Sequence, residues 1–427
     1  MSTVTRDQQR AIEVPQPQLP GRRSEGGFRI LRDGLSRRFC SLESEALRAM
    51  ARRRTGLVDF GDPPIEPALS TLVKSLDFEA DLHPLGRFLI RAHLRGLLET
   101  RLRLTQAWSG QSKTLDASLI RRPIFITGMP RSGSTFLHEL MAEDPENRVP
   151  RVWEVMFPIP GQKSRRGEVD SRVRKAEASL WWFRRLTPRA DSVYPMRAST
   201  PHECVAIHSY TLLSEEFTIM CRIPAYETFL RGTNLGPTYA WQKRFLQYLQ
   251  LSRPTKQWVL KSPDHVNSLP YLLAVFPDAV VIETHRNPLE VLRSAIQLNK
   301  VLEGMFARAS DSVQTRIREA RSLAKHMERL TSFREAHPEL EGRFIDVKYH
   351  DLISDPMAIV LRIYQRLDLR LTKRVAENMQ RLASRRSRYK GRREGPNLAD
   401  LESDGALDRH RLEAYCSRFE IPVSQLR

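Results

Sequence analysis

Short apolar runs alternate with longer amphipathic segments along much of this chain. Four of the runs have the length and composition of buried strands: residues 124–127, 257–261, 279–284 and 344–349. A segment at 308–330 instead places its apolar residues on one face at helical spacing. This alternation predicts an α/β fold in which helices flank a parallel sheet. Ligands of such folds bind at the carboxyl ends of the strands.

Composition divides the chain into further parts. Residues 1–27 are polar and contain several prolines, which predicts a flexible tail. Residues 28–118 are expected to form an N-terminal helical cap, and residues 119–427 the domain that contains the sheet. A helical insertion at about 160–255 is rich in aromatic residues, which suit an acceptor pocket but are also common in a hydrophobic core.

The first predicted strand leads into a polar loop and then a helix, in the sequence RPIFITGMPRSGSTFL at 122–137. Backbone N–H groups at such a helix start point outward, and the helix dipole favours negative charge there. Arg131 adds a cation, and Ser132, Ser134 and Thr135 add hydroxyl donors. The loop therefore predicts a site for a phosphate or a phosphosulfate.

The loop departs from the Walker pattern of nucleotide triphosphatases in one respect. Gly128 and Gly133 have the Walker separation, but Ser134 stands where that pattern has lysine. A P-loop kinase would need this lysine and an acidic magnesium ligand on a nearby strand. A kinase is therefore the weaker alternative. Binding of adenosine 3′,5′-bisphosphate, but not of ATP with magnesium, would separate the two functions.

A second polar cluster follows the predicted strand at 279–284. Asn287 is a suitable N-cap and Pro288 suits the first helical position, so a helix should begin here. Arg286 at the strand end and Ser294 in the first turns of that helix could hold one phosphate together. Taken alone, such a pair is more often an ordinary surface arginine and a helical serine.

Together the two clusters resemble the sulfotransferase family that uses 3′-phosphoadenosine 5′-phosphosulfate, in its bacterial-type branch. The resemblance runs from about residue 85 to the C-terminus and includes five ordered features. These are the loop at 130–135, the segments at 148–154, 258–265 and 276–279, and the Arg286–Ser294 pair. It implies a P-loop-like sulfotransferase fold and transfer of a sulfuryl group to an acceptor hydroxyl.

The resemblance also implies which residues bind this co-substrate. The loop at 130–135 would bind the 5′-phosphosulfate, and the later arginine and serine would bind the 3′-phosphate. A basic loop at 385–393 would close over the 3′-phosphate. The implied binding residues are Arg131, Ser132, Gly133, Ser134, Thr135, Phe136, Arg286, Ser294 and Lys390. Serines replace the commoner threonines in the loop, and Asn287 replaces an aspartate, but neither change removes a donor. The basic loop could equally be a solvated segment.

Sulfuryl transfer needs cations at the leaving phosphate and a base for the acceptor proton. Arg131 and Lys261 are the predicted leaving-group cations. Glu154 is the first candidate for the base, although it could instead form a salt bridge with a nearby arginine. His265 is the second candidate, with a packing role as its alternative. The His-Glu pair at 202–203 is the third.

Charge and cysteine content bound the remaining functions. The formal net charge is +19, which would suit nucleic acid, but the basic residues are spread along the chain without a nucleic-acid-binding motif. We therefore expect no nucleic-acid partner, although a basic nucleic-acid or membrane-surface module remains a third hypothesis, which steep salt dependence without cofactor competition would favour. Four scattered cysteines predict neither a metal site nor a disulfide framework.

The N-terminus lacks a signal-peptide core, and no apolar stretch reaches the length of a membrane span. A cytoplasmic protein is expected, with peripheral membrane contact left open. The acceptor could be a lipid or quinone-like alcohol, a carbohydrate, a phenol or a small metabolite. Aromatic content in the insertion leans toward a hydrophobic alcohol, and the oligomeric state is open.

Overall fold

The computed structural model describes residues 40–160, 170–188, 195–308, 312–387 and 408–422. The predicted tail at 1–27 and the predicted ligand Lys390 lie outside these ranges.

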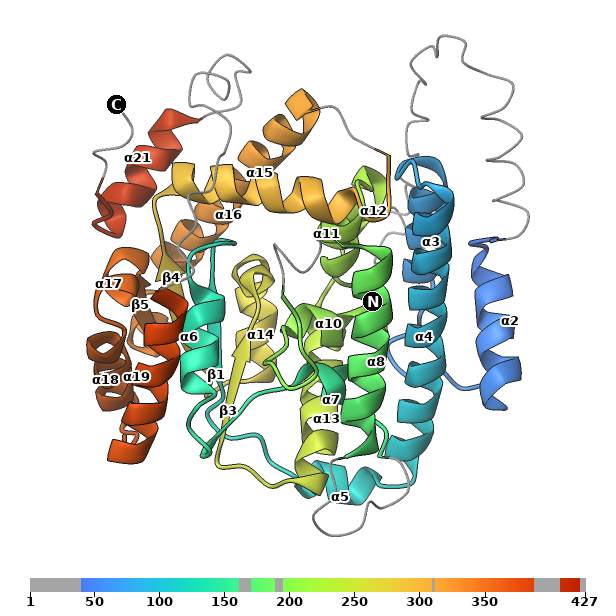
Figure 1. Cartoon of the computed structure of the whole chain (residues 1–427), viewed down its shortest axis with the longest axis horizontal. Coiled ribbons are helices and arrows are strands. Elements are labelled where there is room, and N and C mark those ends of the chain that lie inside the picture. The colour runs from blue at the N-terminus through green and yellow to red at the C-terminus, as the bar shows by residue number, and fades with distance from the viewer. Residues whose placement is uncertain (1–39, 161–169, 189–194, 309–311, 388–407, 423–427) are drawn as a thin grey trace, which may run out of the picture.

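A five-stranded parallel sheet forms the centre of the molecule, in the order β2-β3-β1-β4-β5 (Figure 1). The strands are β1 Ile124–Gly128, β2 Asn147–Arg148, β3 Gln257–Lys261, β4 Val280–His285 and β5 Phe344–Lys348. The predicted parallel sheet is thus confirmed, with four strands within one residue of their expected bounds. The strand β2 was not predicted because two residues carry no periodicity.

Two hydrophobic cores lie against the two faces of the sheet, because successive strand residues point to opposite sides. Ile124 and Ile126 belong to one core, which α6, α18 and α19 complete. Phe125 belongs to the other, larger core. The helices of the first face, with the neighbouring α17, are α6 Ser134–Met141, α17 Tyr349–Ser354, α18 Pro356–Leu367 and α19 Lys373–Ser387.

The larger core joins the N-terminal helices to the sheet. Arg101 of α4 is fully buried there, and its guanidinium donates to the Phe60 and Tyr210 carbonyl oxygens at 2.7 Å each. These bonds attach the predicted cap region to the insertion. The N-terminal helices are α2 Ser44–Thr55, α3 Ala68–Phe78, α4 Pro84–Ser109 and α5 Ser112–Ala117.

Most of the described residues between β2 and β3 are helical. Their helices are α7 Val152–Met156, α8 Ser171–Leu186, α10 Cys204–His208, η1 Ser209–Thr211, α11 Glu216–Met220, α12 Pro224–Arg231 and α13 Gly236–Ser252. The later helices are η2 Pro263–Ser268, α14 Leu269–Val275, α15 Pro288–Glu303, α16 Ser312–Ala336, η3 Pro338–Arg343 and α21 Arg409–Arg418. In Figure 1, α15 runs from the end of β4 across the carboxyl edge of the sheet toward α12.

Candidate active site

The loop between β1 and α6 has the sharp geometry of an anion-binding turn. Gly128 and Gly133 have φ angles of 126° and 96°, a region that side chains disfavour. Space excludes side chains as well, since a Cβ on Gly128 would lie 2.3 Å from the Thr284 carbonyl oxygen. A Cβ on Gly133 would lie 2.9 Å from the ring of Tyr349. Both glycines are therefore required for the loop to fit between its neighbours.

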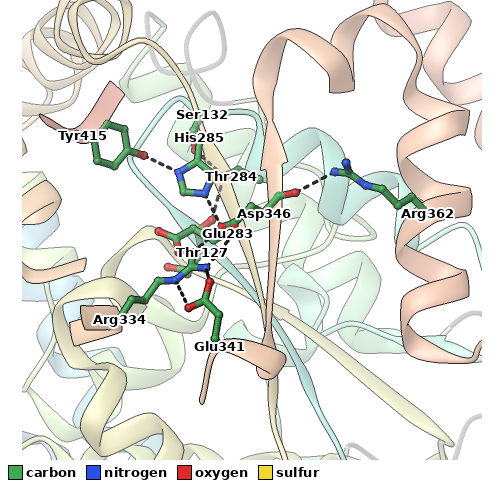
Figure 2. Close-up of polar contacts among 10 residues, drawn as sticks. All are labelled: Thr127, Ser132, Glu283, Thr284, His285, Arg334, Glu341, Asp346, Arg362 and Tyr415. Carbon is green, nitrogen blue, oxygen red and sulfur yellow. Dashed lines mark hydrogen bonds and ion pairs between the residues drawn. The ribbon is translucent and has the colours of Figure 1, made fainter. Parts of the chain in front are cut away.

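The hydroxyl of Ser132 faces inward and holds the loop. It donates to the Met129 carbonyl oxygen and lies 2.6 Å from the Thr284 hydroxyl. Thr284 in turn donates to the Thr127 carbonyl oxygen at 2.9 Å, which ties the loop to β1 and β4 (Figure 2). Ser132 is completely buried, so its hydroxyl supports the loop from behind.

The start of α6 carries the remaining predicted residues of the loop. Thr135 is exposed, Phe136 is half-buried and Ser134 is buried. The first N–H groups of an α-helix have no carbonyl partner within the helix, so they remain available to an anion. The loop thus offers backbone donors in the place where the sequence predicts them.

The structure brings together the two predicted anion-binding clusters. The Arg131 Nε donates to the Ser294 hydroxyl at 3.0 Å, and the Arg286 guanidinium donates to the Arg131 carbonyl oxygen at 3.0 Å. They meet because β1 and β4 are neighbours in register, with Gly128 opposite Thr284. Residues separated by more than 150 positions in the chain therefore form one cationic surface at the strand ends.

Two residues that sequence reasoning missed hold Arg286 in place. Glu290, in the first turn of α15, accepts from the Arg286 Nε at 2.8 Å. The ring of Tyr349 lies 4.1 Å from the Arg286 guanidinium. The same ring lies next to Gly133 of the loop. The i, i+4 spacing of Arg286 and Glu290 could have indicated the first contact. The predicted N-cap is confirmed, since the Asn287 side chain accepts from the Leu289 N–H at 3.0 Å.

Lys261 ends β3 beside the loop, opposite Ile126 of β1. Its side chain is 2% exposed, and its ammonium forms an ion pair with Glu203, whose side chain is 16% exposed. Burial, together with the Lys261 charge, lowers the pKa of nearby His138 to about 3. His138 is therefore neutral, and the cation at this strand end is Lys261.

Glu203 comes from the insertion and immediately precedes α10. An isolated bridge pairs Pro201 with Arg151, and the His202 N–H donates to the Pro150 carbonyl oxygen at 2.7 Å. These backbone contacts fix the segment near the end of β2. The third candidate from the sequence is thus the carboxylate that the fold brings to Lys261.

Glu154, the first candidate for the base, has both carboxylate oxygens engaged. One accepts from the Arg148 guanidinium at 3.0 Å, and the other from the Arg151 backbone N–H at 3.0 Å. The Glu154 side chain is 9% exposed, and Arg148 also stacks on Trp258 at 4.7 Å. This is the salt bridge that the sequence analysis gave as the alternative, and it closes the first turn of α7.

His265, the second candidate, is enclosed by aromatic rings. Its Nδ1 lies 2.8 Å from the Tyr239 hydroxyl, and its ring packs edge-on against Phe125 at 5.0 Å. The residue is completely buried. Burial lowers its pKa well below the usual value, helped by His208 and Lys261. These contacts are those of a packed, neutral histidine.

A buried ionic network supports the ends of β4 and β5 (Figure 2). Arg334 of α16 donates to the Asp346 carboxylate at 2.6 and 3.0 Å and to the Glu283 carboxylate at 3.3 Å. His285, next to Arg286, lies 2.8 Å from Asp346 and 2.7 Å from the Tyr415 hydroxyl of α21. No local sequence pattern predicts this network, because its partners come from separate parts of the chain.

Glu283, His285 and Asp346 are the only group within the described ranges with a spacing that could suit a metal ion. Their ligand atoms lie within 4.8 Å of one another. Figure 2 shows the Arg334 guanidinium among the two carboxylates, where it supplies the positive charge. Arg334 therefore occupies the position between the carboxylates that a metal ion would need, although the Glu283 Oε1 is buried without a hydrogen-bond partner among the described residues.

None of the helices in the described ranges is both long and apolar enough to cross a membrane. The Sulfotransferase family model matches residues 123–373. A relative from Mycobacterium bovis, omega-hydroxy-beta-dihydromenaquinone-9 sulfotransferase Stf3, is 26% identical over 258 residues. This match covers 58% of the chain and 63% of the relative, so the chain spans less than two thirds of that relative's length.

Solved mycobacterial structures have a similar overall fold. The sulfotransferase STF1 from Mycobacterium tuberculosis H37Rv is 29% identical with a TM-score of 0.74, and the match covers 88% of this chain and 98% of that one. The sulfotransferase STF9 from Mycobacterium avium is 26% identical with a TM-score of 0.76, and the match covers 88% of this chain and 96% of that one. The similarity therefore includes the helices outside the sheet.

Proposed function

This chain belongs to the sulfotransferase family, and we propose that it moves a sulfuryl group from 3′-phosphoadenosine 5′-phosphosulfate to the hydroxyl of a lipid-like alcohol. The observation that carries the proposal is the contact of Arg131 with Ser294 and Arg286 at the ends of adjacent strands. One nucleotide with phosphates at both ends can bridge such a surface. Lys261 lies at the next strand end, where the reacting group would be.

Two features support a lipid-like acceptor: the similarity to Stf3 and the helical insertion. Stf3 is named for a dihydromenaquinone, which is a lipid-like molecule. In the insertion, which supplies Glu203, Tyr210, Phe217 and Tyr226 are buried in the larger core. Trp181 and Trp182 of α8 are exposed, and these two rings would suit an apolar acceptor. Together these features favour an alcohol on a hydrophobic chain over a carbohydrate.

The direct test uses the purified protein, isotopically labelled sulfate donor and a bacterial lipid extract. We expect mass spectrometry to find a labelled sulfate ester in the lipid fraction. A labelled product confined to the aqueous fraction would contradict the lipid acceptor but keep the transfer reaction. Turnover of ATP with magnesium, without turnover of the sulfate donor, would instead favour the kinase.

In the proposed donor complex, the backbone N–H groups at the start of α6, with Ser134 and Thr135, hold the 5′-phosphosulfate. Arg131 lies between this end and the 3′-phosphate, which Arg286 and Ser294 hold. Charge-assisted hydrogen bonds to phosphate are roughly twice as strong as neutral ones, which suits this cationic surface to a multiply charged nucleotide.

In the proposed reaction, the acceptor oxygen attacks sulfur in line with the leaving phosphate. The new bond joins that oxygen to sulfur, and the bond from sulfur to the bridging phosphate oxygen breaks. Lys261 stabilises the charge that develops on the leaving phosphate. Glu203 accepts the acceptor proton, because it lies beside Lys261 and keeps some exposed surface.

Replacing Arg131 with glutamine should weaken binding of adenosine 3′,5′-bisphosphate by about 10- to 100-fold, because it removes a charged hydrogen bond donor. Isothermal titration calorimetry measures the effect. Arg374→Gln is the control, since it removes the same charge from an exposed position on α19. Equal affinity of the Arg131 and Arg374 variants would refute the donor site.

Replacing Glu203 with glutamine should lower kcat by about 100-fold and leave the bisphosphate affinity within a factor of about two, because a proton acceptor is lost without a phosphate contact. Steady-state release of the bisphosphate in the presence of the lipid extract measures kcat.

The Glu154→Gln variant distinguishes the role of Glu154 from that of Glu203. This variant should chiefly lower stability, because it breaks the buried pair with Arg148. If Glu154→Gln instead abolishes turnover with an unchanged melting temperature, while Glu203→Gln remains active, the base is Glu154.

A further inference from the structure

A cavity of about 240 Å³ lies between the α11–α12 segment and the first half of α16. Its lining includes one carboxylate, Glu227, and a larger set of cations. The cations are Arg222, Arg231, Arg318, Arg321 and Lys325. The charged side chains that line this cavity therefore give it a positive electrostatic potential.

Three of these cations form no ion pair with any residue that the structure describes. Arg231 pairs with Glu227 at 2.8 Å, and Arg318 pairs with Glu303 and Glu319. Arg222, Arg321 and Lys325 are exposed and form no hydrogen bond or ion pair with another residue in the described ranges. Like charges gathered around one hollow repel one another, and a bound anion would relieve that repulsion.

The cavity lies too far along α15 to share the proposed donor phosphates. Its Arg318 is held by Glu303 at the end of α15, whereas Ser294 lies nine residues earlier on the same helix. At about 1.5 Å per residue this separation along the axis is about 14 Å. An anion in the cavity is therefore a second ligand.

We propose that this cavity binds a phosphate group that belongs to a phospholipid or to a small organic phosphate. Arginine offers a planar pair of donors to phosphate oxygens, and lysine adds a point charge. Exposed apolar residues border the same helices. Phe78 is 75% exposed at the end of α3, which packs against α12, and Val313 is 37% exposed at the start of α16. Such neighbours suit the interfacial region of a bilayer.

The test compares a pocket variant with a matched variant of equal charge. Arg321→Gln/Lys325→Gln removes two of the cations that line the cavity, and Lys373→Gln/Arg374→Gln removes two from α19. In Figure 1, α19 lies on the opposite side of the molecule from α12. Co-sedimentation uses vesicles of phosphatidylcholine with and without phosphatidylglycerol, and calorimetry uses glycerol 3-phosphate.

We expect the wild type to bind the anionic vesicles, the pocket variant to bind them about 10- to 30-fold more weakly, and the α19 variant to change by less than about three-fold. Loss of glycerol 3-phosphate binding in the pocket variant alone, with unchanged vesicle binding, would support the site and identify a small phosphate as its ligand. Equal losses in both variants, or no binding of either ligand by the wild type, would overturn the proposal. No assay here uses sulfuryl transfer, so this result is independent of the proposed function.

Discussion

Replacing Lys261 with methionine should lower kcat by about 1,000-fold while adenosine 3′,5′-bisphosphate still binds. The methionine keeps the length of the side chain but removes the cation proposed to face the leaving phosphate. Removal of one preorganised donor of this kind costs about 100- to 1,000-fold in kcat. Lys261 is 2% exposed, so water would not replace the lost charge readily. Release of the bisphosphate in the presence of the lipid extract measures kcat.

The double variant Lys261→Met/Glu203→Gln controls for the unpaired carboxylate that the single change leaves. If both residues act in one step, the double variant should be little slower than Lys261→Met, because effects within one catalytic unit do not add. If the kcat loss of the double variant equals the product of the two single losses, Lys261 and Glu203 have separate roles. Activity of Lys261→Met near that of the wild type would exclude Lys261 as the leaving-group cation.

Replacing Arg334 with methionine should lower the free energy of unfolding by about 3–5 kcal/mol, because it leaves a buried carboxylate without its partner. Arg334 and Glu283 have side chains that are 2% and 0% exposed. Urea denaturation at neutral pH measures the change. Arg362→Met is the control, since Arg362 is exposed and donates to the Asp346 carbonyl oxygen, so its loss should cost less than about 1 kcal/mol.

The pH dependence of the Arg334 variant provides a second check. Burial, reinforced by the Asp346 charge, raises the pKa of Glu283 well above its usual value. A carboxyl with a raised pKa favours the folded state below the unfolded pKa of about 4.3, and this contribution is lost as pH rises through the folded pKa. The loss of unfolding free energy caused by Arg334→Met should therefore be smaller at pH 4.5 than at pH 8. Addition of Glu283→Gln should recover part of the stability at pH 8.

The sequence predicts the framework of the site well because that framework is local. A strand, a glycine-containing loop and a helix start are specified within residues 122–137, and the Arg286–Ser294 pair lies within eight positions. Neighbouring parallel strands then bring both clusters to one edge, so only the strand order was left to the structure.

The sequence does not reveal which carboxylate reaches the site, because that depends on distant contacts. Glu154 is close in the chain to the loop, yet it binds Arg148 and the Arg151 N–H. Glu203 lies within a long helical insertion and reaches Lys261 only because the fold carries it there. Arg334 similarly joins β4 and β5 from the last turn of α16, and no local pattern marks that partner.

The ion pair between Lys261 and Glu203 joins a strand whose sequence is constrained to helices whose sequence can vary more. Lys261 belongs to a strand fixed by its neighbours, whereas Glu203 belongs to helices that only need to present a carboxylate at that point. Under the proposed mechanism, selection could reshape those helices for a new alcohol without rebuilding the nucleotide end. Exchange of the insertion between relatives would accordingly be a practical route to new acceptor specificity.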